Sequence, residues 1–149
     1  MILSRNIIKN ILVFLVLIVS GCGNQDNAET ASLREAQKQI SQSEKLKNLD
    51  KICRSLPVFE DFEPKRISIG RKGDILFYYY KLKTNLSEVQ SKIKESLPPN
   101  GWVLKRELTG DLEYQAEFEK ENYWIQVSYH EFTEINYSTN CKDLSIANR

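Results

Sequence analysis

The sequence predicts an α+β fold, in which an antiparallel sheet of about five or six strands packs against two helices in the order α-ββ-α-βββ(β). Two stretches repeat apolar residues every three or four positions, as one buried face of a helix requires. Several other stretches alternate apolar and polar residues, as half-buried strands do. The chain has 149 residues, which leaves room for one such domain and a targeting segment.

The first helix is predicted over residues 46–56. Its apolar positions recur at spacings of 3, 4 and 3 and form one stripe: Leu46, Leu49, Cys53 and Leu56. Pro57 ends the helix, because proline lacks a backbone N–H and disfavours helix at the residue before it. Cys53 is therefore expected on the buried side of this helix.

The first two strands are predicted at 67–69 and 75–82. Gly70-Arg-Lys-Gly-Asp74 between them indicates a hairpin turn, and this basic turn lacks the pattern of a phosphate-binding loop. The run over 75–82 is apolar on both faces. Such a strand is expected to be central in its sheet, either covered on both sides or partly exposed to a partner.

A second helix and a run of strands follow. Asn85 with Glu88 predicts a helix cap, and the apolar positions then recur at spacings of 3, 4 and 4: Leu86, Val89, Ile93 and Leu97. Pro98-Pro-Asn-Gly101 forms the turn that ends this helix. Strands are predicted over 102–108, 112–118 and 123–129, with a short last one around 135–139.

Residues 1–21 have the features of a secretory signal peptide. Arg5 and Lys9 make the first segment positive, and an apolar run of nine residues follows at 11–19. A transmembrane helix needs about 20 apolar residues, so this run is too short to span a membrane but suits the core of a signal peptide.

The end of this segment, Val19-Ser20-Gly21-Cys22, resembles the lipobox of bacterial lipoproteins at all four positions. The resemblance covers residues 1–22 only. It implies that the chain is cut before Cys22 and that lipid on this cysteine anchors the protein to a membrane. In a host with two membranes, Gly23 rather than Asp after the cysteine implies the outer membrane, facing the periplasm. The alternatives are an ordinary signal peptide with a chance cysteine, or an uncleaved anchor.

The segment 22–43 is polar and is predicted to tether a single domain at 44–141. Residues 23–27 show no periodicity and indicate a flexible spacer. Ser32 with Glu35 resembles a capping box, which predicts a helix from Ser32 onward, and a disordered tether is the alternative. Residues 142–149 are predicted to form a polar tail.

The cysteines predict a disulfide. If Cys22 carries lipid, Cys53 and Cys141 remain, and export would bring them to an oxidising compartment in which two such thiols commonly pair. Two buried free thiols are the alternative. We expect neither a metal nor a cofactor, because one histidine and two distant cysteines offer no ligand spacing.

Catalytic signals are weak. His130 is the single histidine, and with Glu131 or another glutamate it is a weak candidate for a hydrolase or lyase. No Gly-x-Ser-x-Gly motif accompanies it, so we favour an exposed strand histidine. Glu113, Glu117 and Glu119 form a row that would suit acid–base work or a cation, but a solvated face explains the row as well.

The charge balance argues against nucleic acid as a partner. Without Arg5 and Lys9, 19 basic residues stand against 20 acidic ones in the remaining chain. Binding to nucleic acid usually needs a clearly basic face, which this balance does not indicate.

Aromatic residues give the best indication of a binding surface. Tyr78, Tyr80, Trp102 and Trp124 are the candidate interaction surface, since exposed aromatics mark binding sites; a helix covering that face is the alternative. We therefore expect a non-catalytic, membrane-anchored envelope lipoprotein that binds another envelope protein or a cell-wall component. A small hydrolase or lyase, and a carrier or sensor of an apolar ligand under 86–97, are the alternatives.

Overall fold

The structure is a computed structural model that describes residues 24–56 and 63–146. The predicted signal peptide, Cys22 and Pro57 lie outside these residues. The helices are α2 (Asn24–Gln42), α3 (Glu44–Arg54) and α4 (Leu86–Ser96), with short 3-10 helices η2 (Pro98–Asn100) and η3 (Leu144–Ile146). The strands are β1 (Arg66–Ile69), β2 (Ile75–Tyr80), β3 (Val103–Thr109), β4 (Glu113–Lys120), β5 (Tyr123–His130) and β6 (Tyr137–Asp143). The predicted α+β class is confirmed.

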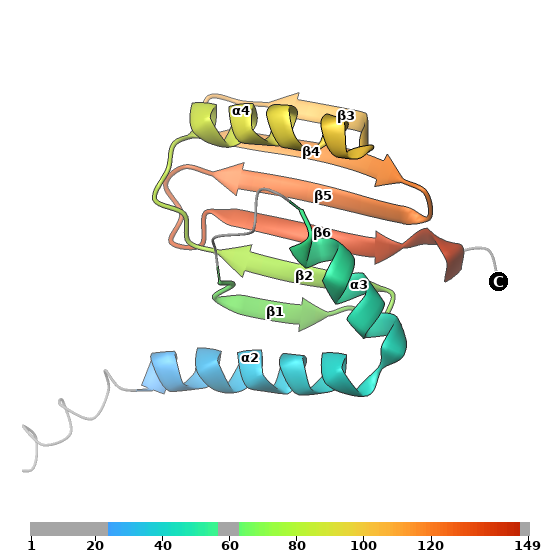
Figure 1. The fold of residues 1–149 in the computed structure, drawn as a ribbon. Helices are drawn as coiled ribbons and strands as arrows, with labels where there is room; N and C mark the ends of the chain where they lie inside the picture. Colours follow the sequence, from blue (N-terminus) through green and yellow to red (C-terminus); the bar gives the residue numbers. More distant parts are fainter. Residues whose placement is uncertain (1–23, 57–62, 147–149) are drawn as a thin grey trace, which may run out of the picture.

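The strands form one antiparallel sheet of six strands in the order β1-β2-β6-β5-β4-β3 (Figure 1). The last strand, β6, lies between β2 and β5 and pairs with both. It therefore joins the first hairpin to the meander of β3, β4 and β5, two parts that are separated in sequence by α4.

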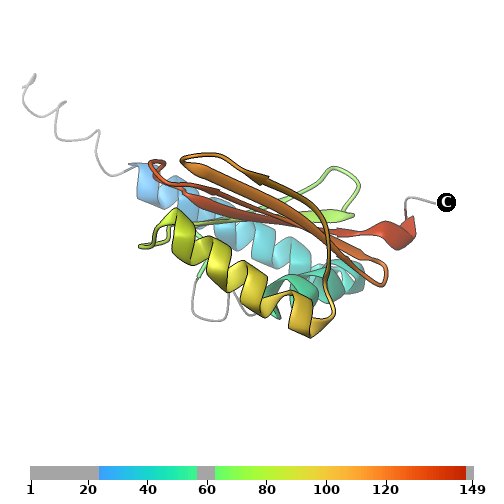
Figure 2. The same ribbon diagram turned by 90° about the horizontal axis from the view of Figure 1, so that it is seen from above.

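The three helices lie on one side of the sheet (Figure 2). Strand residues that face them form the core, together with the apolar sides of α3 and α4. The largest fully buried strand side chains are Tyr78, Tyr114, Phe118, Tyr129 and Tyr137. Among the described residues, no helix is both long enough and apolar enough to cross a membrane.

The apolar stripe predicted for α3 is confirmed. Ser43 caps the helix, because its side chain accepts a hydrogen bond from the Leu46 amide at 3.4 Å. Leu46, Leu49 and Cys53 are buried against the sheet. The helix ends at Arg54, and Leu56 is buried just beyond it.

The N-terminal helix α2 differs from the prediction. A flexible spacer was expected at 23–27 and a helix start at Ser32, but α2 already begins at Asn24. It runs along β1 and buries Ala36 and Ile40 in the core, with Leu33 partly buried (Figure 1). These three positions form one apolar stripe, which the small side chain of Ala36 hides in the sequence. The packed fold therefore begins before residue 44, the predicted boundary.

The connections around α4 and the first hairpin follow the sequence closely. The Asn85 side chain caps α4 by accepting from the Glu88 amide at 3.0 Å, as predicted. Gly101 follows η2 in the left-handed region at φ 83°. In the hairpin, a Cβ on Gly70 would lie 2.2 Å from the Ile75 Cγ2, so a larger residue there forces a shift.

The last strand extends further than predicted. A last strand was expected at 135–139 with a tail from Lys142, but β6 runs from Tyr137 to Asp143. Lys142 pairs with Ile75 on one side and Trp124 on the other, so a neighbouring strand holds it on each side. Hydrogen bonding on both sides explains why a polar segment continues as a strand.

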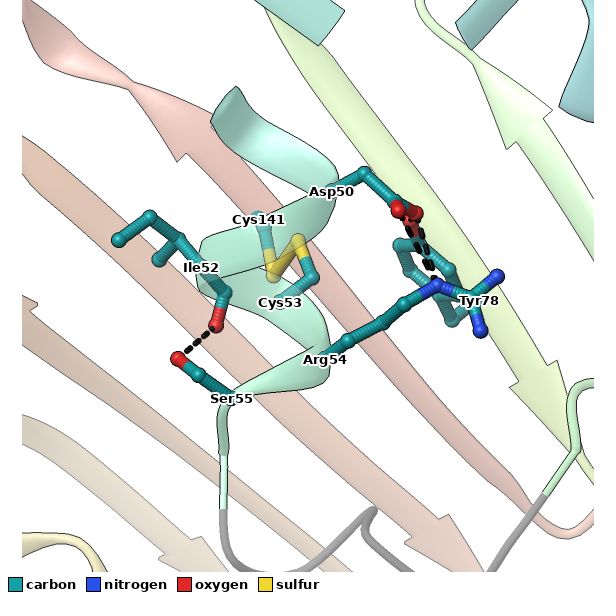
Figure 3. Close-up of a disulfide and its surroundings, with 7 residues drawn as sticks. All are labelled: Asp50, Ile52, Cys53, Arg54, Ser55, Tyr78 and Cys141. Carbon is teal, nitrogen blue, oxygen red and sulfur yellow. Dashed lines mark hydrogen bonds and ion pairs between the residues drawn. A yellow bond between two sulfur atoms is a disulfide. The ribbon is translucent and has the colours of Figure 1, made fainter. Parts of the chain in front are cut away.

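Cys53 of α3 and Cys141 of β6 form the predicted disulfide, with their Cα atoms 6.0 Å apart (Figure 3). Beside it, the Tyr78 hydroxyl donates a hydrogen bond to Asp50, which also accepts from the Arg54 Nε at 3.0 Å. Burial and this hydrogen bond raise the pKa of Tyr78 above its ordinary value, so the hydroxyl stays protonated. Both contacts hold α3 to the sheet.

The disulfide is expected to stabilise the fold strongly, since it closes a loop with a sequence separation of 88. Replacing both cysteines by serine should lower the free energy of unfolding by about 4–5 kcal/mol, because the unfolded chain regains the entropy of that loop. Urea unfolding of the purified protein measures this loss. A reductant should destabilise the native protein and leave the double variant unchanged. A loss below about 1 kcal/mol would contradict this role.

The Tyr78 hydroxyl provides a second test of how α3 is held. Tyr78→Phe should cost about 1–2 kcal/mol, because it removes a partly buried hydrogen bond to a charged group. Tyr79→Phe, on the opposite face of the same strand, is the matched control and should cost less. If the two variants lost the same free energy of unfolding in urea, the hydrogen bond from Tyr78 to Asp50 would not contribute to stability.

Candidate functional site: the open face of the sheet

The side of the sheet opposite the helices is here called the open face. No helix among the described residues covers it (Figure 2). Strand pairing assigns its members. They are Arg66 and Ser68 of β1; Ile75, Phe77 and Tyr79 of β2; Ser138, Asn140 and Lys142 of β6; Trp124, Gln126, Ser128 and His130 of β5; Glu113, Gln115, Glu117 and Glu119 of β4; and Val103, Arg106 and Leu108 of β3.

The strand register aligns these side chains in rows across the sheet. The first row is Ile75, Lys142, Trp124 and Glu119. The second is Phe77, Asn140, Gln126 and Glu117, in which the Asn140 amide donates to the Gln126 oxygen at 2.8 Å. The third is Tyr79, Ser138, Ser128 and Gln115. Aromatic rings therefore flank a strip of amides and hydroxyls.

The structure keeps one of the four predicted surface aromatics at the surface. Trp124 is half-buried on the open face. The prediction is wrong for Tyr78, Tyr80 and Trp102, which are only 1%, 3% and 6% exposed. The register of β2 turns its even-numbered tyrosines toward α3 and the core, and Trp102 is buried at the start of β3, where its amide donates to the Leu97 carbonyl at 3.2 Å.

Two further aromatics of the open face lie outside the four residues predicted as the interaction surface. Phe77 and Tyr79 are half-buried there, and the Arg66 guanidinium lies over the Tyr79 ring, 4.1 Å from its centroid. Because β2 is apolar on both faces, its sequence cannot indicate which set of alternate residues faces the helices. The pairing of Tyr78 with Ile67 and Thr139, both buried, determines this in the structure.

The glutamates of β4 have partners on the neighbouring strands, and two of them, Glu117 and Glu119, are paired with cations. Glu119 lies 3.1 Å from Lys105, and Glu117 lies 4.0 Å from Arg106, both on β3. Glu113 lies 3.5 Å from His130 of β5. Within residues 24–56 and 63–146, no group of histidine, cysteine and acidic side chains is placed to hold a metal ion. Glu117 and Glu119 are thus charge-paired on the solvated face of the sheet.

A hollow of about 400 Å³ lies at one end of the sheet, between the turn that joins β3 to β4 and the turn that joins β5 to β6. It is open to solvent, and His130 lines it together with Glu113. The histidine is thus paired with the cross-strand Glu113 rather than with Glu131, its predicted partner. Both side chains are more than half exposed.

The chemistry available in this hollow is limited. Thr133 supplies a hydroxyl to the lining, but its oxygen lies 2.9 Å from the Ile135 carbonyl and 3.2 Å from the His130 carbonyl. Its single hydrogen is therefore shared with the backbone. The hydrolase alternative predicted a closed pocket beside His130, whereas the observed hollow is open to water. The His130 side chain is exposed to solvent there.

The carrier alternative predicted an apolar cavity beneath 86–97. In the structure, the buried side of α4 is filled by Val89 and Ile93, and Leu97 follows at its end. All three are almost completely buried within the common core. The space between this helix and the sheet is therefore occupied by the protein's own side chains.

The exposure of Trp124 is testable through stability. Trp124→Ala should cost about 1–2 kcal/mol, since its side chain is only partly removed from water. Ile125→Ala, its fully buried neighbour on the same strand, should cost about 3–4 kcal/mol. Chemical unfolding of both variants compares them directly. A larger loss for Trp124→Ala would indicate that this ring is part of the core.

A scan against models of protein families found no match to this chain, and searches of curated proteins and of solved structures found no similar protein.

Proposed function

We propose that this protein is a lipid-anchored, non-catalytic binding module of the bacterial cell envelope, and that its open face contacts another envelope protein. The observation that carries this proposal is the uncovered sheet face that presents Trp124, Phe77 and Tyr79. Aromatic rings provide large contact areas at little entropic cost and are enriched where proteins bind each other.

The surroundings of these rings suit a macromolecular partner. Small molecules bind in concave pockets that enclose most of their surface, whereas the open face is an exposed sheet. Gln126, Asn140 and Ser128 lie among the aromatics and offer donors and acceptors for specific hydrogen bonds. The glutamates at the margin are already paired with cations and provide a polar rim.

The anchor in this proposal rests on the resemblance of Val19-Ser20-Gly21-Cys22 to a lipobox. Lipid on Cys22 would hold the domain at a membrane, facing the periplasm from the outer membrane in a host with two membranes. Acyl chains contribute about 0.8 kcal/mol per buried CH₂ group, so two or three chains give stable attachment. Mass spectrometry of the mature N-terminus identifies the lipid, and Cys22→Ser should abolish the modification.

A cell-wall component is the alternative partner of the same face. Rings beside amides and hydroxyls also suit stacking and hydrogen bonding with sugars. Co-sedimentation of the mature domain with purified peptidoglycan tests this alternative. Retention that is lost in Trp124→Ala would favour the cell wall over a protein.

A hydrolase or lyase remains a second candidate, favoured by the His130–Glu113 pair beside the hollow. His130→Ala should leave the cellular role unchanged if the protein is a binding module. Loss of that role in a variant that folds and is lipidated normally would favour the enzyme.

Site-specific photo-crosslinking in living cells tests the proposed partner surface. A benzoylphenylalanine in place of Trp124 or Gln126 should produce a covalent adduct of one defined mass, because both positions lie on the open face. Glu95, exposed on α4 on the helical side of the sheet, provides the matched control position and should produce none.

Adducts from Glu95 alone, or from no position of the open face in a folded and lipidated protein, would contradict the proposal. An adduct from the open face should also weaken when Tyr79→Ala is introduced beside the crosslinking residue. This combination separates specific contact from random collision.

A further inference from the structure

Two exposed apolar side chains lie in the turns beside the hollow. Phe132, between β5 and β6, is 80% exposed, and Leu112, between β3 and β4, is 50% exposed. Leu108, at the end of β3, is also exposed. We call Leu112, Phe132 and the turns that carry them the tip. No role in the fold accounts for an aromatic ring so fully in water.

The tip lies at the end of the molecule where α2 begins. In Figure 1 the turns that follow β3 and β5 lie on the same side of the sheet as the start of α2, and the view from above in Figure 2 agrees. The C-terminal end of β6 lies at the opposite end. The turns that carry Leu112 and Phe132 thus lie at the end of the sheet where α2 begins, whereas two other exposed apolar side chains, Val103 and Leu104, lie at the opposite end of β3.

We propose that the tip inserts Phe132 and Leu112 into the interface of the membrane to which Cys22 is anchored. This inference rests on the proposed lipid anchor. Cys22 precedes Asn24 by two residues, which extend over at most about 7 Å. Because α2 packs against β1 rather than forming a free tether, the anchor leaves the whole domain little freedom to move away from the bilayer.

The charge of the tip defines the kind of membrane surface. Asp111, Glu113 and Glu131 line the hollow together with the two apolar side chains, and Glu134 follows in the turn that carries Phe132. Four carboxylates would be repelled by an anionic surface, so the tip suits zwitterionic headgroups with an accessible ammonium. Interfacial insertion of apolar side chains typically reaches about 5–10 Å, as a side chain on a turn can.

This orientation leaves the open face available. The strands run from the tip toward the far end of the molecule, so the sheet extends away from the bilayer (Figure 1). Trp124 pairs with Lys142 near the end of β6, which is the far end of the sheet. A membrane-bound tip and a partner on the open face are therefore compatible.

Fluorescence quenching by brominated lipid tests the proposal with the full lipidated protein in zwitterionic phosphatidylcholine vesicles. In Phe132→Trp, the fluorescence added over the native protein should be lost when the lipid acyl chains carry bromine. Val103→Trp is the matched control: Val103 is 58% exposed but lies at the opposite end of β3, about 20 Å from the tip. Its added fluorescence should persist.

The outcomes separate the two proposals. A mature protein without lipid on Cys22 would overturn both the anchor and the insertion of the tip. A lipidated, vesicle-bound protein in which Phe132→Trp and Val103→Trp are quenched equally, or not at all, would overturn the insertion alone. The insertion would also be overturned if the two tryptophan variants showed no difference in quenching and Phe132→Ser converted a dimer in solution to a monomer. That result would assign the tip to contact with a second copy of the chain.

Discussion

The position of β6 between β2 and β5 is the constraint on which the rest of the structure depends. This strand completes the sheet, and its Cys141 is joined to Cys53 of α3. One covalent bond thus links the second helix of the described fold to its last strand. The hydrogen bond from Tyr78 to Asp50 adds a second contact between α3 and the sheet on the same face (Figure 3).

Because the helices pack on one face of the sheet, the opposite face is left exposed to solvent. The helices bury one set of alternate residues on each strand, and the remaining set faces solvent. On β4 the outward set is charged and paired with β3, whereas on β2 and β5 it includes Phe77, Tyr79 and Trp124. A solvated sheet needs only polar residues on its outer face, so the aromatic part of that face is the feature that suggests binding.

Local patterns in the sequence predicted the elements well, because short-range chemistry decides them. The cap at Asn85 and the stripe of α3 depend on residues within one helix, and the disulfide was predicted from the two cysteines that remain besides Cys22. The helical register of α2 was missed because Ala36 contributes little apolar area to its stripe.

The pairing of strands that are distant in the sequence was harder to predict. The insertion of β6 beside β2 brings together residues more than 50 positions apart, and no local pattern indicates it. The same difficulty applied to the surface aromatics. Tyr78 and Tyr79 are adjacent and chemically identical, and only the pairing of β2 with its neighbouring strands determines which ring is buried in the core and which faces solvent. Likewise, His130 contacts Glu113 across the sheet rather than Glu131, its neighbour in the sequence.

The helices cover one face of the sheet and leave the other face accessible to solvent and partners. Hydroxyl-radical footprinting of the purified protein, read out by mass spectrometry, measures the accessibility of each aromatic side chain. Trp124 and Phe77 should be oxidised readily, whereas Trp102 and Tyr78 should be protected. Equal protection of Trp124 and Trp102 would contradict an open face and would show that another segment covers it.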